Sequence, residues 1–199
     1  MRLILIRHGE TEENVKGIAQ GTLPGVLTEK GIAQAGKVCW RLKDEKIDQI
    51  YVSDLKRTVD TYYKIKNSLP NVPVLFVPEL REYCRGVFNG KSREVLHQHY
   101  LKQKVDYWDY TWEGGESLSN VQKRTVSFFR DLLKTHKNET VMLITHGAII
   151  TTLLLHLLKK KGREDYHDYH PNNSSVTILN VKREEDFNIE VFNCQKHLD

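Results

Sequence analysis

The sequence predicts an α/β protein in which helices cover both faces of a mostly parallel sheet, and three observations support this. Short apolar runs of strand length alternate along the chain with longer segments in which apolar residues recur at helical spacing. The short runs are continuously apolar rather than alternating, which is typical of strands covered on both faces. Two β-rich runs follow each other at the end of the chain without a helix between them, which predicts a hairpin that supplies an antiparallel edge.

The first half of the chain alternates predicted strands with predicted helices. In order, these are a strand over 3–6, a helix from Thr28 to near Lys43, a strand over 47–53, a helix from Asp54 to about Ser68 and a strand over 72–77. Thr28 can cap its helix because its hydroxyl accepts a hydrogen bond from a first-turn amide. Pro70 is expected to stop the second helix, since proline lacks the amide hydrogen that a helix interior needs.

The second half continues the alternation and ends in the hairpin. Its elements are helices from Ser92 to about Lys102 and from Ser117 to about Lys134, a strand over 140–145, a helix over 148–160 and strands over 176–181 and 188–192. Helical connections form right-handed crossovers, which make the joined strands parallel. We therefore expect a three-layer α/β/α sandwich. The length of 199 residues suits a single domain over 1–199, and no linker or repeat interrupts it.

The composition argues against several classes of function. Lys plus Arg is 30 and Asp plus Glu is 26, and a formal charge of +4 gives no strong reason to expect nucleic acid or a membrane as partner. The three cysteines are widely spaced and form no Cys-x-x-Cys pair, so we expect no disulfide framework, zinc site or redox motif. The apolar runs are too short for a signal peptide or a membrane span, and we expect a cytoplasmic protein.

Polar residues follow the predicted strands at their carboxyl ends, where open α/β sheets bind ligands. Arg7 and His8 come directly after the first strand, and Arg57 lies one helical turn after the second. His146 follows the last of the parallel strands, and Glu82 comes shortly after the third. Because these strand ends meet at one edge of the sheet, we expect the five side chains to converge there.

This set of residues has the chemistry of a phosphate site. Arginine offers a rigid fork that matches phosphoryl oxygens, and two arginines can neutralise a dianionic monoester. Nearby cations disfavour the protonated imidazole, and a neutral histidine is a nucleophile. One histidine would attack phosphorus, while a second histidine or an arginine stabilises the equatorial oxygens. A carboxylic acid would protonate the leaving alkoxide and then activate water; Glu82 is the first candidate, with Glu79 and Glu116 as alternatives.

Other patterns in the chain are expected to have no catalytic role. His97-x-His99 and His167-x-x-His170 lack a carboxylate at helical spacing, so we expect exposed polar positions rather than metal ligands. Residues 86–92 mimic a phosphate-binding P-loop, but three residues separate their glycines where that motif needs four. Tyr107, Trp108, Tyr110 and Trp112 are expected to line the pocket or to pack, rather than to stack on a base.

Several blocks of residues carry a family resemblance. They are Arg7-His8-Gly9-Glu10-Thr11 with Asn14, Leu27-Thr28-Glu29 with Gly31, Gln34 and Ala35, Ser53-Asp54-Leu55 with Arg57-Thr58, Leu80-Arg81-Glu82 with Gly86 and Gly90, Gly114-Gly115-Glu116-Ser117, and Thr145-His146-Gly147. In this order, and over most of the chain, the blocks resemble the motifs of the histidine phosphatase superfamily, also called the phosphoglycerate mutase-like superfamily. That resemblance implies the same α/β/α fold.

The resemblance also implies roles for individual residues. His8 would be the nucleophile, and Glu82 would be the general acid and base. The residues implied to hold the transferring phosphoryl group are Arg7, Asn14, Arg57 and His146. The residues implied to border the substrate are Gln20, Gly21, Tyr83 and Arg85. No cofactor and no metal are implied, the partner is a small phosphorylated molecule, and the protein is expected to be a monomer or a homodimer.

Two departures from the family pattern leave the identity of the substrate open. Asn89 stands where the family often has Glu, and residues 23–26 replace a stretch that often contains Asp. The short segment over 90–114 resembles the phosphatase branch, because mutases are typically longer and carry insertions that cap the site. The expected function is a metal-independent phosphomonoesterase acting on a sugar phosphate or a similar metabolite. The alternative is a cofactor-dependent phosphoglycerate mutase.

Overall fold

Six strands form one mixed sheet in the computed structural model of the chain, which describes residues 1–69 and 71–199. The strands are β1 (Arg2–Arg7), β2 (Gln49–Ser53), β3 (Val74–Val77), β4 (Thr140–Thr145), β5 (Val176–Arg183) and β6 (Asp186–Cys194). Their order across the sheet is β3-β2-β4-β1-β5-β6. The first four are parallel, whereas β5 is antiparallel to β1 and β6 is antiparallel to β5. The predicted antiparallel edge is therefore confirmed.

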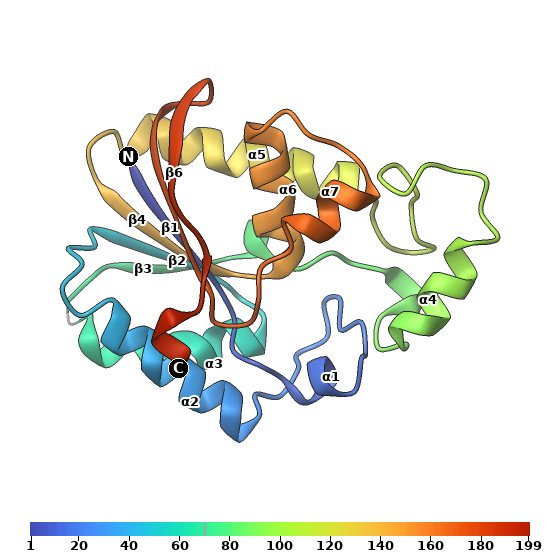
Figure 1. The fold of residues 1–199 in the computed structure, drawn as a ribbon, viewed down its shortest axis with the longest axis horizontal. Coiled ribbons are helices and arrows are strands. Elements are labelled where there is room, and N and C mark those ends of the chain that lie inside the picture. The colour runs from blue at the N-terminus through green and yellow to red at the C-terminus, as the bar shows by residue number, and fades with distance from the viewer. Residues whose placement is uncertain (70) are drawn as a thin grey trace.

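Helices cover both faces of this sheet, as Figure 1 shows. On one face lie α2 (Glu29–Arg41) and α3 (Lys56–Ile65), and on the other lie α5 (Leu118–Thr135) and α6 (Gly147–Leu157). Each pair packs together within its own layer. The predicted three-layer α/β/α architecture is confirmed.

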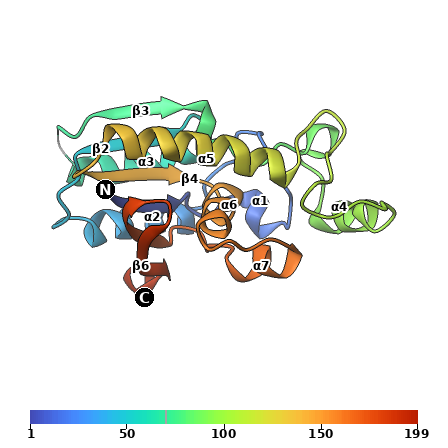
Figure 2. The ribbon, with the colours of Figure 1, turned by 90° about the horizontal axis from the view of Figure 1, so that it is seen from above.

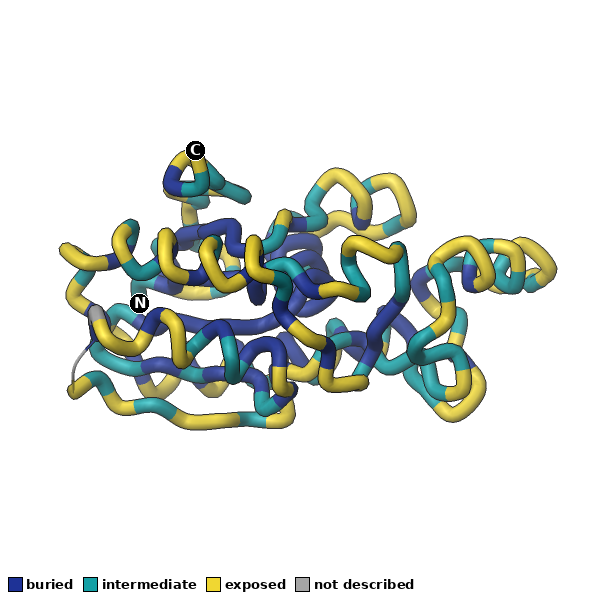
Figure 3. The backbone as a smooth tube through the Cα atoms, turned by 90° about the horizontal axis from the view of Figure 1, so that it is seen from below, coloured by how far each residue is buried: buried dark blue, intermediate teal, exposed yellow. Residues whose placement is uncertain are grey.

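The apolar residues of the central strands divide between two cores. In β1, Leu3 and Leu5 belong to the core under α5 and α6, whereas Ile4 and Ile6 belong to the core under α2 and α3. Successive side chains of a strand point to opposite faces, so a strand buried on both faces must be apolar at every position. Figure 3 shows the result as a continuous dark strand region between more exposed helices.

Hydrogen bonds from side chains fix several helix starts where the sequence predicts them. The Thr28 hydroxyl accepts from the Gly31 amide at 2.9 Å, and the Ser117 hydroxyl accepts from the Asn120 amide at 3.1 Å. Helix α6 ends before the predicted residue 160, since Lys159 adopts the left-handed backbone conformation (φ 55°) that terminates a helix. The expected helix stop at Pro70 lies outside the described residues.

The remaining elements are α1 (Glu12–Val15), α4 (Arg93–Tyr100), α7 (Arg163–Asp168) and the 3₁₀ helices η1 (Lys66–Ser68), η2 (Pro78–Leu80), η3 (Gly86–Phe88) and η4 (Lys196–Leu198). Most of them surround the carboxyl ends of the parallel strands, whereas η1 follows α3 and η4 lies at the end of the chain. The strand arrows of β3 and β4 point toward the end of the molecule where α1, α4 and α7 lie (Figure 2). None of the helices in the described residues is long and apolar enough to span a membrane.

Candidate active site

The strand order places the predicted site residues beside one another. Strand β4 lies between β1 and β2, so His146 after β4 stands between His8 after β1 and Arg57 in the helix after β2. The rings of His8 and His146 are 5.3 Å apart between centroids. The carboxyl ends of these strands meet as the sequence predicts, and the two histidines come together in the folded chain.

His8 is held as a neutral imidazole with a defined tautomer. Its side chain is buried, and its Nδ1 lies 2.8 Å from the Gly9 carbonyl oxygen. Because a carbonyl oxygen can only accept, Nδ1 carries the proton and Nε2 carries the lone pair. Burial, followed by the cations Arg57 and Arg7, lowers the pKa of His8 well below its ordinary value. The ring therefore presents an unprotonated nitrogen that is available as a nucleophile.

His146 is fully buried behind His8. Its Nε2 lies 2.8 Å from the Ser53 hydroxyl, while its Nδ1 is buried without a partner in the described protein. Burial, and then Arg57 and His8, lower the pKa of His146 well below its ordinary value. His146 is thus neutral, and its Nδ1 has no hydrogen-bond partner among the described residues.

Two buried arginines flank the histidines. Arg7 Nη1 donates to the Pro171 carbonyl oxygen at 2.5 Å, and Arg57 donates to the carbonyl oxygens of Leu23 and Gly21 at 2.6 and 2.9 Å. The Nε of each arginine is buried and has no partner in the described protein. Burial lowers the pKa of Arg57 to about 10, which leaves it cationic near neutral pH. Burying an N–H group without a hydrogen-bond partner lowers the stability of the fold. A bound acceptor such as a phosphoryl oxygen would satisfy these groups.

Glu82 lies at the same cavity and is positioned by the segment around it. Its Oε1 accepts from the Tyr83 amide at 2.8 Å and from the Ala148 amide, at the start of α6, at 3.3 Å. Its charge reaches both Arg7 and Arg57, where it opposes the lowering of their pKa by burial. A carboxyl group therefore lines the same cavity as His8 and the two arginines.

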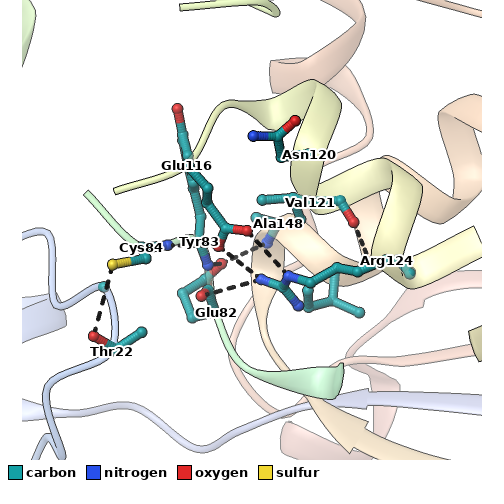
Figure 4. A network of polar contacts seen from close by, with 12 residues as sticks. Thr22, Glu82, Tyr83, Cys84, Glu116, Asn120, Val121, Arg124 and Ala148 are labelled. Carbon is teal, nitrogen blue, oxygen red and sulfur yellow. Dashed lines mark hydrogen bonds and ion pairs between the residues drawn. The ribbon is translucent and has the colours of Figure 1, made fainter. Parts of the chain in front are cut away.

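An ion pair fixes the backbone of the Glu82 segment, as Figure 4 shows. Arg124 in α5 pairs with Glu116 at 2.9 Å and also donates to the carbonyl oxygens of Glu79 and Glu82. Glu116 in turn accepts from the Cys84 amide at 2.9 Å. The Glu116 carboxylate is therefore occupied by this structural network, and the Glu79 side chain is exposed outside the cavity. Of the three carboxylates considered from sequence, Glu82 is the one that lines the cavity.

A cavity of about 420 Å³ is lined by His8, Arg7, Arg57 and Glu82, whereas the fully buried His146 is not among its lining residues. Of the remaining residues expected to touch substrate, those that line it are Asn14, Gln20, Gly21 and Arg85. Tyr83 is not among the lining residues; its ring is buried in the core, and its hydroxyl accepts from Trp112 Nε1 at 2.7 Å. Asn14 accepts from Asn173 Nδ2 at 3.0 Å, which holds the start of α1 against the loop before β5.

Asn89, the departure from the family pattern, is not a cavity-lining residue but contacts Gly21 and Arg85, which are. Its Oδ1 accepts from the Arg85 amide at 2.9 Å, and its Nδ2 donates to the Thr22 hydroxyl at 3.2 Å. Gly21 lies against it with φ 55°, and a Cβ there would stand 1.8 Å from Asn89 Oδ1. Asn89 thus links the segment after Glu82 to the loop that contains Gly21.

The expectation that the histidine pairs occupy exposed positions is wrong for most of their members. His97 and His170 are partly buried and line the cavity, and His99 stacks on Trp112 at 5.7 Å between centroids. His167 is exposed but also stands at the cavity rim. The fold brings them there because α4 and α7 lie over the carboxyl ends of the strands. In the described residues, no group of three or more His, Cys, Asp or Glu could hold a metal ion.

Further lining residues were not identified from the sequence, namely Arg93, Tyr100, Arg163 and Tyr166. They come from α4 and α7, which the motifs do not cover. The rings of Tyr166 and His170 lie 5.5 Å apart between centroids, although His170 follows the end of α7 and no helical spacing in the sequence joins them. The polar residues around them give no apolar periodicity that would have indicated a short helix.

The geometry agrees with comparisons to known proteins. The family profile of the histidine phosphatase superfamily (branch 1) matches residues 3–195, and the chain belongs to this family. A probable phosphatase of Schizosaccharomyces pombe is 29% identical over 206 residues, covering 100% of this chain and 96% of that protein. The structure of Bacillus stearothermophilus YhfR has a TM-score of 0.89 at 28% identity, covering 100% of this chain and 99% of the other.

A third similar protein has a phosphorylated ligand in its structure. Phosphoserine phosphatase from Entamoeba histolytica, in complex with 3-phosphoglyceric acid, has a TM-score of 0.83 at 31% identity. The match covers 99% of this chain and 98% of that one. The superfamily and the phosphatase class expected from the sequence are confirmed.

Proposed function

We propose that the protein hydrolyses small phosphomonoesters through a phosphohistidine intermediate on His8. The observation that carries this proposal is a neutral, buried His8 flanked by two buried arginines whose Nε–H groups lack partners. A dianionic phosphoryl group in front of His8 would satisfy those N–H groups and neutralise both cations. The names of similar proteins, a phosphoserine phosphatase among them, support a small phosphorylated metabolite as substrate.

The reaction proceeds in two displacements at phosphorus. His8 Nε2 attacks the phosphorus atom, and the bond to the ester oxygen breaks as that oxygen takes the proton of the Glu82 carboxyl group. The Glu82 carboxylate then accepts a proton from water as the water oxygen attacks the phosphohistidine. The P–N bond breaks, inorganic phosphate leaves, and His8 and the protonated Glu82 are regenerated.

The other site residues stabilise charge on the phosphoryl oxygens. Arg7 and Arg57 supply fixed cations, and Asn14 supplies a side-chain amide at the cavity wall. The Ser53 hydroxyl accepts weakly from the Leu55 amide at 3.4 Å, so its own hydrogen can go to His146 Nε2. The proton of His146 then sits on Nδ1, the nitrogen without a protein partner, and can be donated to a phosphoryl oxygen.

The test is release of phosphate from p-nitrophenyl phosphate and a panel of phosphorylated metabolites in excess EDTA. The proposal expects undiminished activity with EDTA and loss of activity in His8→Ala. His156→Gln, a substitution at a histidine that pairs with Glu184 away from the cavity, is the matched control and keeps activity. Complete loss in EDTA, or full activity in His8→Ala, would overturn the proposal. Isomerisation of 3-phosphoglycerate without phosphate release would instead support the mutase alternative.

A further inference from the structure

The cavity continues past the reaction centre into a second cluster of cations. Arg85 comes from the segment after Glu82, Arg93 is the first residue of α4, and Arg163 is the first residue of α7. All three line the cavity together with Arg7 and Arg57. Three separate parts of the chain thus direct guanidinium groups to one outer region, which we call the outer arginine cluster.

The arginines of the outer cluster differ from most arginines elsewhere on the protein in lacking carboxylate partners. Arginines outside the cavity that form ion pairs with carboxylates are Arg2, Arg41, Arg81, Arg124 and Arg130. Across the described chain, none of the outer three forms such a pair, and Arg183 on β5 is the one arginine outside the cavity that shares this property. The carboxylates that line the cavity are Glu82, at the reaction centre, and Glu94, which accepts from Gln98.

Contacts other than ion pairs hold two of these guanidinium groups. Arg85 lies 4.5 Å over the ring of Tyr83, and Arg163 lies 5.7 Å from the ring of Tyr107. Arg163 also contacts His97 Nδ1 at 3.2 Å, which joins α7 to α4 across the cavity. An aromatic face orients a guanidinium without occupying its N–H groups, so the donors of Arg85, and those of Arg163 other than the Nη2–H at His97, stay available for a ligand.

The charge of the cluster reaches the reaction centre and is not neutralised there. Arg93 adds to the lowering of the Arg7 pKa by burial, against the opposing effect of Glu82. Burial, followed by Arg7, Arg93 and Arg85, lowers the pKa of His170 to about 3. A monoester phosphate would neutralise Arg7 and Arg57, and Glu94 is then the carboxylate among the described cavity-lining residues that remains to balance the three outer cations.

We propose that the outer arginine cluster binds a second anionic group, a carboxylate or a phosphate, carried by the phosphomonoester that reacts at His8. The guanidinium fork matches both oxyanions. Either anion would bring negative charge to three cations that form no ion pair in the described chain. This inference rests on the proposed phosphatase function, because it names the class of substrate used at that same site.

Matched substrate pairs test the proposal and distinguish the two anions. For the carboxylate, 3-phosphoglycerate is compared with glycerol 3-phosphate, which has a hydroxymethyl group in place of the carboxylate. For the phosphate, fructose 1,6-bisphosphate is compared with fructose 6-phosphate. The expected result is a kcat/KM that is on the order of 10- to 100-fold higher for the doubly anionic member of at least one pair, as for charge-assisted hydrogen bonds.

Substitutions in the outer arginine cluster then test whether it causes the preference for the doubly anionic substrate. Arg85→Gln, Arg93→Gln and Arg163→Gln should each lower the kcat/KM ratio within the preferred pair, whereas Arg183→Gln, at the exposed unpaired arginine on β5, should leave it unchanged. Ratios within about twofold for both pairs in the native protein, or ratios unaffected by all three substitutions, would overturn the proposal.

A binding measurement separates this inference from the proposed function. Calorimetry on His8→Ala compares the dissociation constants of 3-phosphoglycerate and glycerol 3-phosphate, and of the two fructose phosphates, without turnover. Tighter binding of the doubly anionic member supports the cluster even where no substrate reacts, and equal binding in both pairs contradicts it. Phosphate release from p-nitrophenyl phosphate that depends on His8 keeps the phosphatase function intact when the anion preference fails.

Discussion

Lowering the pH from about 6.5 to about 5.5 is expected to destabilise the folded protein through its buried histidines. His8 and His146 stay neutral in the folded protein, because burial and then neighbouring cations hold the pKa of each well below 6.5. In the unfolded chain both regain an ordinary pKa and bind protons as the pH falls. The unfolded state therefore binds more protons than the folded state, and the free energy of unfolding decreases as the pH is lowered.

The magnitude follows from the number of protons bound. Across this interval an unfolded histidine binds on average about three-quarters of a proton, and one proton corresponds to about 1.4 kcal/mol per pH unit. Each buried histidine thus contributes about 1 kcal/mol, or about 2 kcal/mol for His8 and His146 together. His170, whose pKa is lowered to about 3, adds up to about 1 kcal/mol more. Glu184, whose pKa is lowered to about 2, affects stability only at lower pH. The stability it contributes is lost as the pH falls from the ordinary pKa of a carboxyl group toward about 2.

Urea denaturation at the two pH values measures this difference. The buffer must contain no phosphate, since bound phosphate would stabilise the folded state by mass action. His8→Gln should reduce this change in the free energy of unfolding by about 1 kcal/mol. Gln20→Ala removes a polar neighbour in the same cavity that does not titrate, and it should leave the change unaltered. A change of less than about 1 kcal/mol in the native protein would refute the reasoning.

Three further substitutions test how the site is held. Arg124→Met should lower kcat on the order of 10- to 100-fold by freeing the segment that carries Glu82, the proposed general acid, while Arg130→Met, at an exposed ion pair, should leave kcat unchanged in a steady-state assay. Gly21→Ala should cost more unfolding free energy than Gly17→Ala in urea denaturation. Both glycines have a left-handed backbone conformation, which costs alanine about 1–2 kcal/mol at either position. Only the Cβ of Gly21→Ala would also lie against a neighbouring side chain. Ser53→Ala should lower the free energy of unfolding by about 1–3 kcal/mol, because it leaves a buried ring nitrogen without its partner; an unchanged midpoint would contradict that hydrogen bond.

The parts of the fold that the sequence predicts correctly are those with strong local signals. The strand over 140–145 is observed with the predicted bounds, Thr28 caps its helix as expected, and the helix predicted from Ser117 begins there. Helix α7, with six residues, was not predicted. Its chain is mostly polar and lacks an apolar stripe, and it forms against the cavity through tertiary contacts that no local pattern encodes.

The candidate site likewise contains residues that the sequence predicts and residues that it does not. Arg7, His8, Arg57 and His146 converge because the parallel strands end at one edge of the sheet, and the parallel direction follows from the strand–helix alternation. Tyr83 does not line the cavity, although it adjoins Glu82, because its ring is buried with Trp112 in the core. The outer arginine cluster and the placement of the histidine pairs depend on how α4 and α7 fold back, which the spacing of single residues does not reveal.

The most direct test of the proposed mechanism is to identify the residue that carries the phosphoryl group during turnover. Rapid quenching with base during hydrolysis of a labelled phosphomonoester, followed by peptide mass spectrometry, should find an acid-labile, base-stable phosphoryl group on His8. The same label should be absent from His8→Ala and should disappear when the intermediate is chased with unlabelled substrate. Turnover without any phosphoryl-enzyme, or a phosphoryl group on another residue, would contradict nucleophilic catalysis by His8.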